Sequence, residues 1–452
     1  MAPHSNQQHA RSHSEHCAPG VFVFNPLAEG RLAYGKAFNP TKHQAQLVRD
    51  LQNLPQFVCR GEDVVIVEQR PSAEFLRSLQ QAGFAVPEFV EAGSGSGIQP
   101  LANRELGQLR PWAWSPDAIE LLAPLFRNVT GEKRSAEQWF NPNIARLYSK
   151  AWSAGLLRRF LRDGPPEAWL CTENEIGTAA TSVEEALAAI AAIRRRGHHR
   201  IAVKEAVGVA GSNAMRLFEP DLLETHRRWM ANALTNGREL VIEPWLEREM
   251  DFSVQLEMTA GGLTLCGYTG LLNDLKGQFQ ANWAEPLHRK HLPAALAALF
   301  PETPDISDRL LQLYDNLFES LETEFRRAKY LGPIGIDAFA FRAPDGKCRI
   351  KPIVEINPRY TMGRLTVELM KHTCPGSAGI FRIINRPVLK ASGFESFTQY
   401  ANSLAKQFPV RLEGERVPRI REGAICLNDP ARAESFLAVF QVGQNVQDLN
   451  IR

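Results

Sequence analysis

Hydrophobic residues near the start of the chain fall into short runs separated by amphipathic stretches. Residues 21–24 and 64–67 are apolar runs of strand length, and a helical pattern follows the second and ends at Gly83. Strand-length runs that alternate with helical periodicity predict a small parallel α/β unit. We expect this unit to span residues 20–115. The polar, His-containing residues 1–19 have too little apolar surface to fold and are predicted to be a disordered tail.

The central part of the chain shows several further helical patterns. Residues 116–170 are mostly helical in pattern, and Ser182-Val-Glu-Glu185 is a capping box that opens another helix. Residues 306–330 form a long amphipathic pattern, which is typical of a helix packed on a core. Residues 269–304 are polar with interleaved aromatic residues, so we expect a long loop that either contacts a substrate or is simply solvated.

Composition restricts the class of protein. The 452 residues are 44% hydrophobic and 23% charged, with a net charge of +2, which is typical of a soluble globular protein and gives no basic surface for nucleic acid. Seven cysteines without C-x-x-C spacing favour reduced thiols. No run of 18 apolar residues and no signal-peptide pattern occurs. We therefore expect a cytoplasmic protein with no membrane span and no nucleic-acid partner.

The strongest candidate chemistry lies in two strand patterns joined by a turn, residues 332–342 and 350–359. An antiparallel pair is predicted, because the linking residues carry turn chemistry. Residues two apart on a strand share a face, so Glu355 and Asn357 point the same way and Asp337 can join them. Two carboxylates and an amide on an apolar platform predict a site for Mg²⁺, with Mn²⁺ as an alternative.

Two arginines follow this pair of strands. Arg359 comes directly after it and is suited to neutralise phosphate oxygens through its planar guanidinium. Arg364 lies in a predicted helix at residues 361–370 whose N-terminus faces the same site. Arg364 is therefore either a residue that holds a substrate carboxylate or phosphate, or an ordinary surface arginine.

A second candidate phosphate site precedes the first in the sequence. The strand pattern 201–204 ends in Lys204, and a glycine-rich stretch with Gly208, Gly211 and Ser212 follows. Glycines let backbone N–H groups approach phosphate closely, and a lysine on a strand adds a point charge. The pattern alone is also typical of an ordinary hairpin.

In this order, the lysine strand, the glycine-rich loop and the Asp followed by Glu-x-Asn-x-Arg resemble the ATP-grasp superfamily. The resemblance implies an α/β (α+β) protein with an ATP-grasp fold of two α+β subdomains over residues 116–375, whose lid subdomain covers about 170–242. Residues 20–115 then correspond to the pre-ATP-grasp domain, and residues 376–452 form a C-terminal elaboration that packs on the core.

The same resemblance implies how ATP is held. An acidic residue, Glu243, begins the hinge strand, backbone groups up to Leu246 take the purine edge, and Trp245 forms a wall of the pocket. Either Glu249 or Asp251 takes the ribose hydroxyls, and the sequence does not choose between them.

The implied activity is that of a carboxylate–amine ligase, which forms an amide through an acyl phosphate and releases ADP. Lys150 and Lys204 then contact the phosphates and Arg359 stabilises the transferring phosphoryl group, while Arg364 and Asp274 are candidate substrate residues. The expected substrates are a small carboxylate and a small amine, such as amino acids or short peptides, and a homodimer is an option. The alternatives are a phosphotransferase, a non-catalytic ATP-binding protein, or an α/β enzyme that binds no nucleotide.

Overall fold

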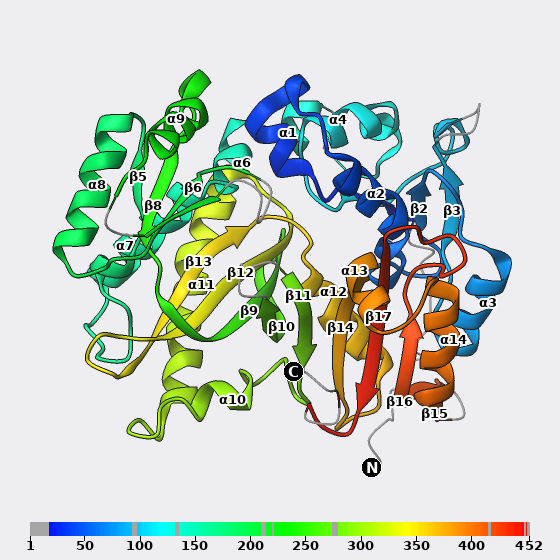
Figure 1. Ribbon diagram of the computed structural model, residues 1–452. Helices are drawn as coiled ribbons and strands as arrows, with labels where there is room; N and C mark the ends of the chain where they lie inside the picture. The colour runs from blue at the N-terminus through cyan, green and yellow to red at the C-terminus, as the bar shows by residue number, and fades with distance from the viewer. Residues whose placement is uncertain are drawn as a thin grey trace, which may run out of the picture.

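The computed structural model describes most of the chain, and the account below concerns these residues. They are residues 18–92, 97–131, 135–208, 214–218, 221–273, 279–414, 417–446 and 449. Within them the strands form three sheets (Figure 1). The predicted tail therefore lies almost wholly outside the described residues.

The N-terminal unit is built on a four-stranded parallel sheet, as the alternating pattern predicts. The strands are, in spatial order, β3 (Glu88–Glu91), β2 (Val64–Val67), β1 (Val21–Val23) and β4 (Leu109–Pro111). Its helices are α1 (Ala28–Tyr34), α2 (Lys42–Leu51) and α3 (Ala73–Gln81). All residues of β1 and β2 are buried, because helices cover both faces of a parallel sheet.

Four helices connect this unit to the remaining sheets, and they confirm the predicted helical character of residues 116–170. They are α4 (Pro116–Leu122), α5 (Ala136–Trp139), α6 (Pro142–Leu147) and α7 (Lys150–Asp163). The Ser149 hydroxyl accepts hydrogen bonds from the N–H groups of Ala151 and Trp152 and so caps α7. Lys150 is therefore the first residue of a helix whose start is fixed.

The second sheet, called the lid sheet below, is antiparallel and four-stranded. Its order is β5 (Thr178–Ala180), β8 (Leu240–Pro244), β6 (Ile201–Glu205) and β7 (Ala214–Leu217). The helices α8 (Val183–Arg195) and α9 (Glu224–Ala233) belong to the same small core. Ser182 caps α8 by accepting from the Glu185 N–H at 3.1 Å, but the Glu185 carboxylate accepts from Thr181 rather than completing the box at Ser182.

The third sheet has nine strands and carries the predicted metal residues. Its order is β13 (Cys348–Asn357), β12 (Gly332–Arg342), β9 (Glu247–Thr259), β10 (Gly262–Asn273), β11 (Phe279–Ala284), β14 (Ala378–Asn385), β17 (Phe436–Gly443), β16 (Arg419–Cys426) and β15 (Arg411–Glu413). Its associated helices are α10 (Ala294–Ala297), α11 (Ile306–Ala328), α12 (Met362–Leu369), α13 (Arg386–Ala391) and α14 (Phe397–Gln407).

The expectation of a long loop at residues 269–304 is wrong in its first half. Strand β10 continues to Asn273, and β11 pairs with both β10 and β14. The polar side chain of Asn282 misled the prediction, because it is buried in the sheet, where its amide donates to the Gly270 carbonyl at 3.2 Å. A buried polar residue with a partner disturbs the hydrophobic pattern of a strand without disrupting the strand.

The C-terminal strands extend the large sheet towards the N-terminal unit. Helix α2 contacts this end, where the Asp50 carboxylate accepts hydrogen bonds from the backbone N–H groups of Glu434, Ser435 and Phe436. Residues after 376 are thus part of the continuous sheet and link it to the first unit. The domain boundaries given above stay predictions.

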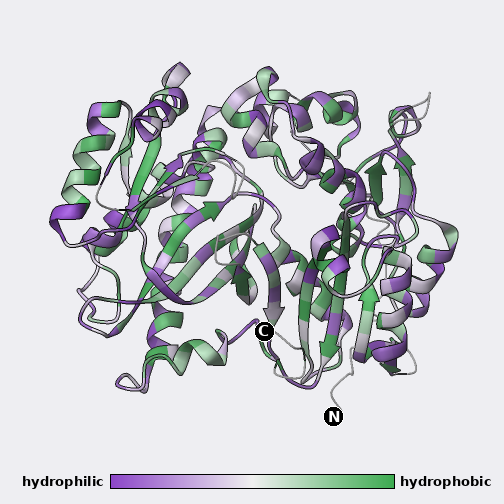
Figure 2. Cartoon of the chain, viewed as in Figure 1, coloured by the Kyte–Doolittle hydropathy of each residue, from purple (hydrophilic) through white to green (hydrophobic). Residues whose placement is uncertain are grey.

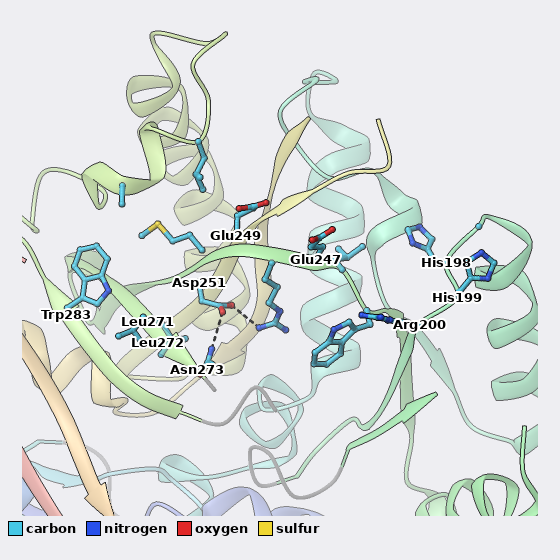
Figure 3. A pocket seen from close by; sticks show the side chains of 17 residues that line it. His198, His199, Arg200, Glu247, Glu249, Asp251, Leu271, Leu272, Asn273 and Trp283 are labelled. Atoms are coloured by element: carbon cyan, nitrogen blue, oxygen red, sulfur yellow. Dashed lines mark hydrogen bonds and ion pairs between the residues drawn. The ribbon is translucent and has the colours of Figure 1, made fainter. Parts of the chain in front are cut away.

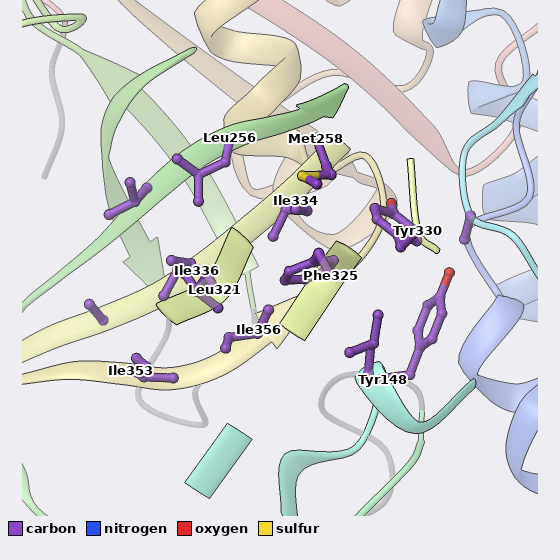
Figure 4. Packing of buried hydrophobic residues seen from close by; sticks show 14 of the residues in the cluster. Tyr148, Leu256, Met258, Leu321, Phe325, Tyr330, Ile334, Ile336, Ile353 and Ile356 are labelled. Atoms are coloured by element: carbon purple, nitrogen blue, oxygen red, sulfur yellow. The ribbon is translucent and has the colours of Figure 1, made fainter. Parts of the chain in front are cut away.

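One face of the large sheet is buried on α11, as the amphipathic pattern predicts. Ile334 and Ile336 of β12 and Ile353 and Ile356 of β13 belong to the same core cluster as Leu321 and Phe325 of α11 (Figure 4). Figure 2 shows the same strands as green bands inside a largely polar envelope. Because this packing holds the two strands firmly, the opposite face presents Asp337, Glu355 and Asn357 in fixed positions.

None of the helices among the described residues is both long and apolar enough to cross a membrane. Six cysteines lie in the described part of the chain, and all six are free thiols, as predicted.

Candidate functional site

The predicted metal residues lie together on the β12–β13 pair. The strands are antiparallel, with Asp337 opposite Glu355 and Gly335 opposite Asn357, which confirms the predicted hairpin. The Asn357 amide donates to Asp337 Oδ2 at 3.1 Å. Two carboxylates and one carboxamide therefore meet on the face of the sheet that is not covered by α11.

Asp337 is held in a setting that disfavours its charge. Burial, and next the neighbouring negative charge of Glu355, raise the pKa of Asp337 to about 6. The Ser253 hydroxyl, on the adjacent strand β9, donates to Asp337 Oδ1 at 3.0 Å and offsets part of this effect. A buried carboxylate of this kind gains free energy when a cation is placed beside it.

Glu355 has a cationic partner. Burial by itself would raise the pKa of Glu355, but the Lys150 ammonium, with Nζ 3.0 Å from Oε1, outweighs it and lowers the pKa. The Lys150 backbone N–H donates to the Ala206 carbonyl at 2.8 Å, just beyond β6. Lys150 thus joins Glu355 and its neighbours on β12 and β13 to the lid sheet.

The residues present fit a hard divalent cation. Oxygen donors from two carboxylates and an amide are the kind of protein ligands that Mg²⁺ takes alongside nucleotide phosphates. In the part of the chain that the structure describes, no group of three or more His, Cys, Asp or Glu side chains is placed to hold a metal. A cation here therefore depends on Asn357 and on oxygens that the protein does not supply.

A second charged cluster lies on the lid side. Glu243 of β8 is buried between Lys204 of β6, with which it forms an ion pair, and Lys351 of β13, whose Nζ lies 3.0 Å from Glu243 Oε2. Burial opposes the charge of Glu243, but Lys204 and then Lys351 hold its pKa well below the usual range. The cluster spans the gap between the lid sheet and the nine-stranded sheet.

Sequence reasoning missed Lys351. A lysine in a strand usually points to solvent, yet this side chain is buried and lies opposite Phe339. The available signal was its position four residues before Glu355, because residues separated by an even number on a strand share a face. The same reasoning also missed Ser253, whose position on β9 depends on strand pairing that the sequence does not reveal.

The structure divides the predicted nucleotide residues between two cavities. A narrow one of about 10 Å³ is lined by the ion-paired residues Lys150, Lys204, Glu243, Lys351 and Glu355. An open one of about 1010 Å³ is lined by the hinge residues Trp245, Leu246, Glu249 and Asp251, together with Trp283 and Leu271 (Figure 3). The Lys150–Glu355 and Lys204–Glu243–Lys351 ion pairs border the narrow cavity, whereas the Arg248–Asp251 ion pair borders the open one.

Glu249 and Asp251 differ in their surroundings. The Glu249 side chain is 26% exposed, and its carboxylate accepts a hydrogen bond from Arg342 at 2.7 Å. The Asp251 side chain is 15% exposed and accepts hydrogen bonds from Arg248 at 2.9 Å and from Asn273 at 3.3 Å, as the dashed lines in Figure 3 show. Asp251 is two residues from Ser253 on β9 and so shares the face that carries Asp337.

The predicted arginines are placed differently. Arg359 joins the metal residues, because its Nη2 donates to Asn357 Oδ1 at 3.0 Å. The Arg364 guanidinium instead binds Glu257 at 2.7 Å and Glu368 at 2.9 Å, and so does not join the cluster. Its role as a substrate residue stays a prediction.

The predicted glycine-rich loop is described only at its start. Gly208 is buried shortly after β6, whereas Gly211 and Ser212 lie outside the described residues. Asp274 also lies outside the described residues.

The three sheets and their order define an ATP-grasp fold, as the sequence motifs predict. Pyruvate carboxylase T882A from Rhizobium etli has a TM-score of 0.50 and 13% identity over 95% of this chain and 36% of that chain. Biotin carboxylase from Campylobacter jejuni has a TM-score of 0.49 and 12% identity, covering 95% of this chain and 89% of the other. An N5-carboxyaminoimidazole ribonucleotide synthetase, purK, has a TM-score of 0.49 and 12% identity, covering 95% and 94%. No family model and no curated protein matches the sequence.

Proposed function

We propose that the protein is an ATP-dependent carboxylate–amine ligase that uses Mg²⁺. The observation that carries the proposal is the convergence of Asp337, Glu355 and Asn357 on one strand pair with Lys150 in direct contact. This convergence supports a cation site with oxygen ligands next to cationic side chains for phosphate. The fold is one on which such chemistry occurs, but the site itself is the argument.

The proposed reaction has two steps. An oxygen of the substrate carboxylate attacks the γ-phosphorus of ATP, the bond from that phosphorus to the bridging oxygen breaks, and ADP leaves. The amine nitrogen then attacks the acyl carbon, inorganic phosphate departs, and the nitrogen loses a proton to give the amide. Mg²⁺ would neutralise charge on the β- and γ-phosphates, with Asp337, Glu355 and Asn357 as its protein ligands.

Lys204 would exchange Glu243 for phosphate, and the second cation beside Glu243, Lys351, makes this exchange feasible. In this structure Lys204 is paired with Glu243, and phosphate oxygens would compete for the same ammonium. A buried carboxylate that loses its partner is costly. Lys351 stays bonded to Glu243 Oε2, so Lys204 can move to the nucleotide without leaving that carboxylate unpaired.

The remaining nucleotide contacts follow from the hinge. Leu246 and Trp245 would border the purine in the large cavity, and Asp251, rather than the more exposed Glu249, would take the ribose hydroxyls. Arg359 would stabilise charge on the transferring phosphoryl group. The substrates in this proposal are a small carboxylate and a small amine, such as amino acids or short peptides.

The test is ADP formation with Mg·ATP across a panel of amino acids and short peptides, singly and in pairs. Turnover that needs two substrates, yields an amide by mass spectrometry and disappears in Glu355→Gln supports the ligase. The matched control is Glu74→Gln, which makes the same chemical change at an exposed residue of α3 that lines neither cavity.

The other results favour the rival functions. Turnover with one substrate and a stable phosphorylated product would replace the ligase with a phosphotransferase. Nucleotide binding without turnover in any pair, by both the wild type and Glu355→Gln, would leave a non-catalytic ATP-binding protein.

A further inference from the structure

We propose that Glu29, supplied by the N-terminal unit, is the positioning residue that aims Arg359 at the transferring phosphoryl group. Glu29 lies in the first turn of α1 and is 5% exposed, and it forms an ion pair with Arg359 Nε. The inference rests on the proposed function, in which Arg359 faces the γ-phosphate. It gives the N-terminal unit a part in catalysis.

The first argument is that each nitrogen of the Arg359 guanidinium has a different partner. Nε binds Glu29, Nη1 donates to the Tyr360 carbonyl at 3.2 Å, and Nη2 donates to Asn357 Oδ1 at 3.0 Å. Asn357 is also a proposed metal ligand, so its oxygen cannot serve both partners fully. Nη2 is therefore the nitrogen that exchanges Asn357 for a phosphate oxygen, while Nε stays on Glu29.

The second argument is charge and burial. A carboxylate as buried as Glu29 is costly without a cation, and the structure provides Arg359. Conversely, the negative charges of Glu29 and then Glu355 raise the pKa of Arg359 despite its burial. A carboxylate that holds a guanidinium from behind restricts its rotation, and pre-orientation of this kind is what a transition-state contact requires.

The third argument is that the N-terminal unit fixes the backbone of Arg359 as well as its side chain. Ala113 forms a β-bridge with Arg359, and the Tyr360 N–H donates to the Trp112 carbonyl at 2.8 Å. Asn25, just after β1, holds Ala113 by hydrogen bonds of 2.8 Å and 3.0 Å to its carbonyl and N–H. Arg359 is therefore positioned by a framework that belongs to the first 115 residues.

Helix α1 also contacts the lid sheet, at strand β6. Its last residue, Tyr34, donates from its hydroxyl to the Glu205 carboxylate, with oxygen distances of 2.7 Å and 2.6 Å, and the Arg238 guanidinium lies 4.5 Å from the Tyr34 ring centre. Glu205 directly follows Lys204 on β6, and neighbours on a strand point to opposite faces. In Figure 1, α1 accordingly lies between the lid sheet and the strands of the N-terminal unit. One short helix thus contacts elements that carry two of the proposed phosphate-binding cations.

The experiment compares two nucleotides that differ in the γ-phosphoryl group, Mg·AMPPNP and Mg·ADP, by isothermal titration calorimetry. Glu29→Gln keeps the shape and an acceptor but removes the charge. We expect it to weaken AMPPNP binding about tenfold or more, in line with the loss of other orienting partners, and to leave ADP binding unchanged. In an Arg359→Ala background, Glu29→Gln should add no further loss.

Glu74→Gln, at an exposed position of α3, is the matched control for the loss of one negative charge. Should Glu29→Gln fail to fold, Glu29→Asp keeps the charge at a shorter reach and should show the same selective loss to a smaller degree. Equal loss for both nucleotides, or no loss for either, would overturn the positioning role. Failure of the wild-type protein to bind either nucleotide would instead remove the proposed function on which the inference rests.

Discussion

Asp337 carries a penalty in the metal-free protein that the variant Asp337→Asn should relieve. The carboxyl pKa is raised from 3.8 to about 6, chiefly by burial and then by Glu355. At about 1.4 kcal/mol per pKa unit, the charged form costs the folded state about 3 kcal/mol at neutral pH. Asparagine keeps only one acceptor oxygen, so either the hydrogen bond from Asn357 or the one from Ser253 is lost, which subtracts about 1 kcal/mol. The net expectation is a gain of about 2 kcal/mol.

The pH dependence of that gain follows from the sign of the shift. Because the folded state holds the proton more tightly than the unfolded state, stability of the wild type falls as pH rises from 3.8 to about 6. The variant has no such proton. Below pH 3.8 the lost hydrogen bond should therefore leave the variant about 1 kcal/mol less stable than the wild type; its advantage should appear as pH rises across this window and be complete above about pH 6.

The assay is thermal unfolding in EDTA at pH 4 and pH 7.5. At pH 7.5 we expect the midpoint of Asp337→Asn to lie about 2 °C above that of the wild type, and at pH 4 it should lie no higher than that of the wild type. Addition of Mg·ATP should stabilise the wild type but not the variant. A variant that is less stable at pH 7.5, or whose difference from the wild type does not change with pH, would refute the reasoning.

Three further outcomes are expected. Glu243→Gln leaves Lys204 and Lys351 without a buried anion, so it should lower the free energy of unfolding by about 3 kcal/mol in a thermal unfolding assay. The same change at the exposed Glu247 should lower it little. Equal effects of the two variants would contradict the buried ion-pair cluster. Below about pH 6 the Asp337 carboxyl is protonated, and Mg²⁺ must displace this proton to bind. The Mg²⁺-dependent affinity for ATP, measured by calorimetry, should therefore fall as pH drops below about 6. An affinity that does not change with pH would exclude Asp337 as a ligand. Gly270→Ala would place its Cβ 1.9 Å from Trp283 Cε2, so it should destabilise the sheet by about 1–3 kcal/mol in the same unfolding assay, and an unchanged midpoint would show that this contact relaxes freely.

The sequence was most informative where local patterns determine structure. The β12–β13 hairpin, the capped α8 and the amphipathic α11 depend on strand alternation, a cap and helical periodicity, and all three appear in the structure. Each motif depends on only a few neighbouring residues and can therefore be recognised in the sequence. The order of the motifs along the chain was then enough to predict the fold.

The sequence was least informative where distant segments meet. Glu29 and Arg359 are 330 positions apart, and Lys351 and Glu243 are 108 apart, so neither pair leaves a local signal. Strand β11 was mistaken for loop because its polar Asn282 is satisfied by a partner on β10. In each case a long-range contact, rather than local preference, decides where a polar side chain can be buried.

The most direct test of the central claim follows one oxygen atom. Once the panel identifies an acid, that acid is supplied with ¹⁸O in its carboxylate, together with the amine and Mg·ATP, and the released phosphate is analysed by mass spectrometry. An acyl-phosphate ligase transfers one carboxylate oxygen to phosphate, so we predict that each phosphate released carries one ¹⁸O from a fully labelled acid. Phosphate without the label, with ADP still formed, would show that the carboxylate does not attack the γ-phosphorus and would contradict the account.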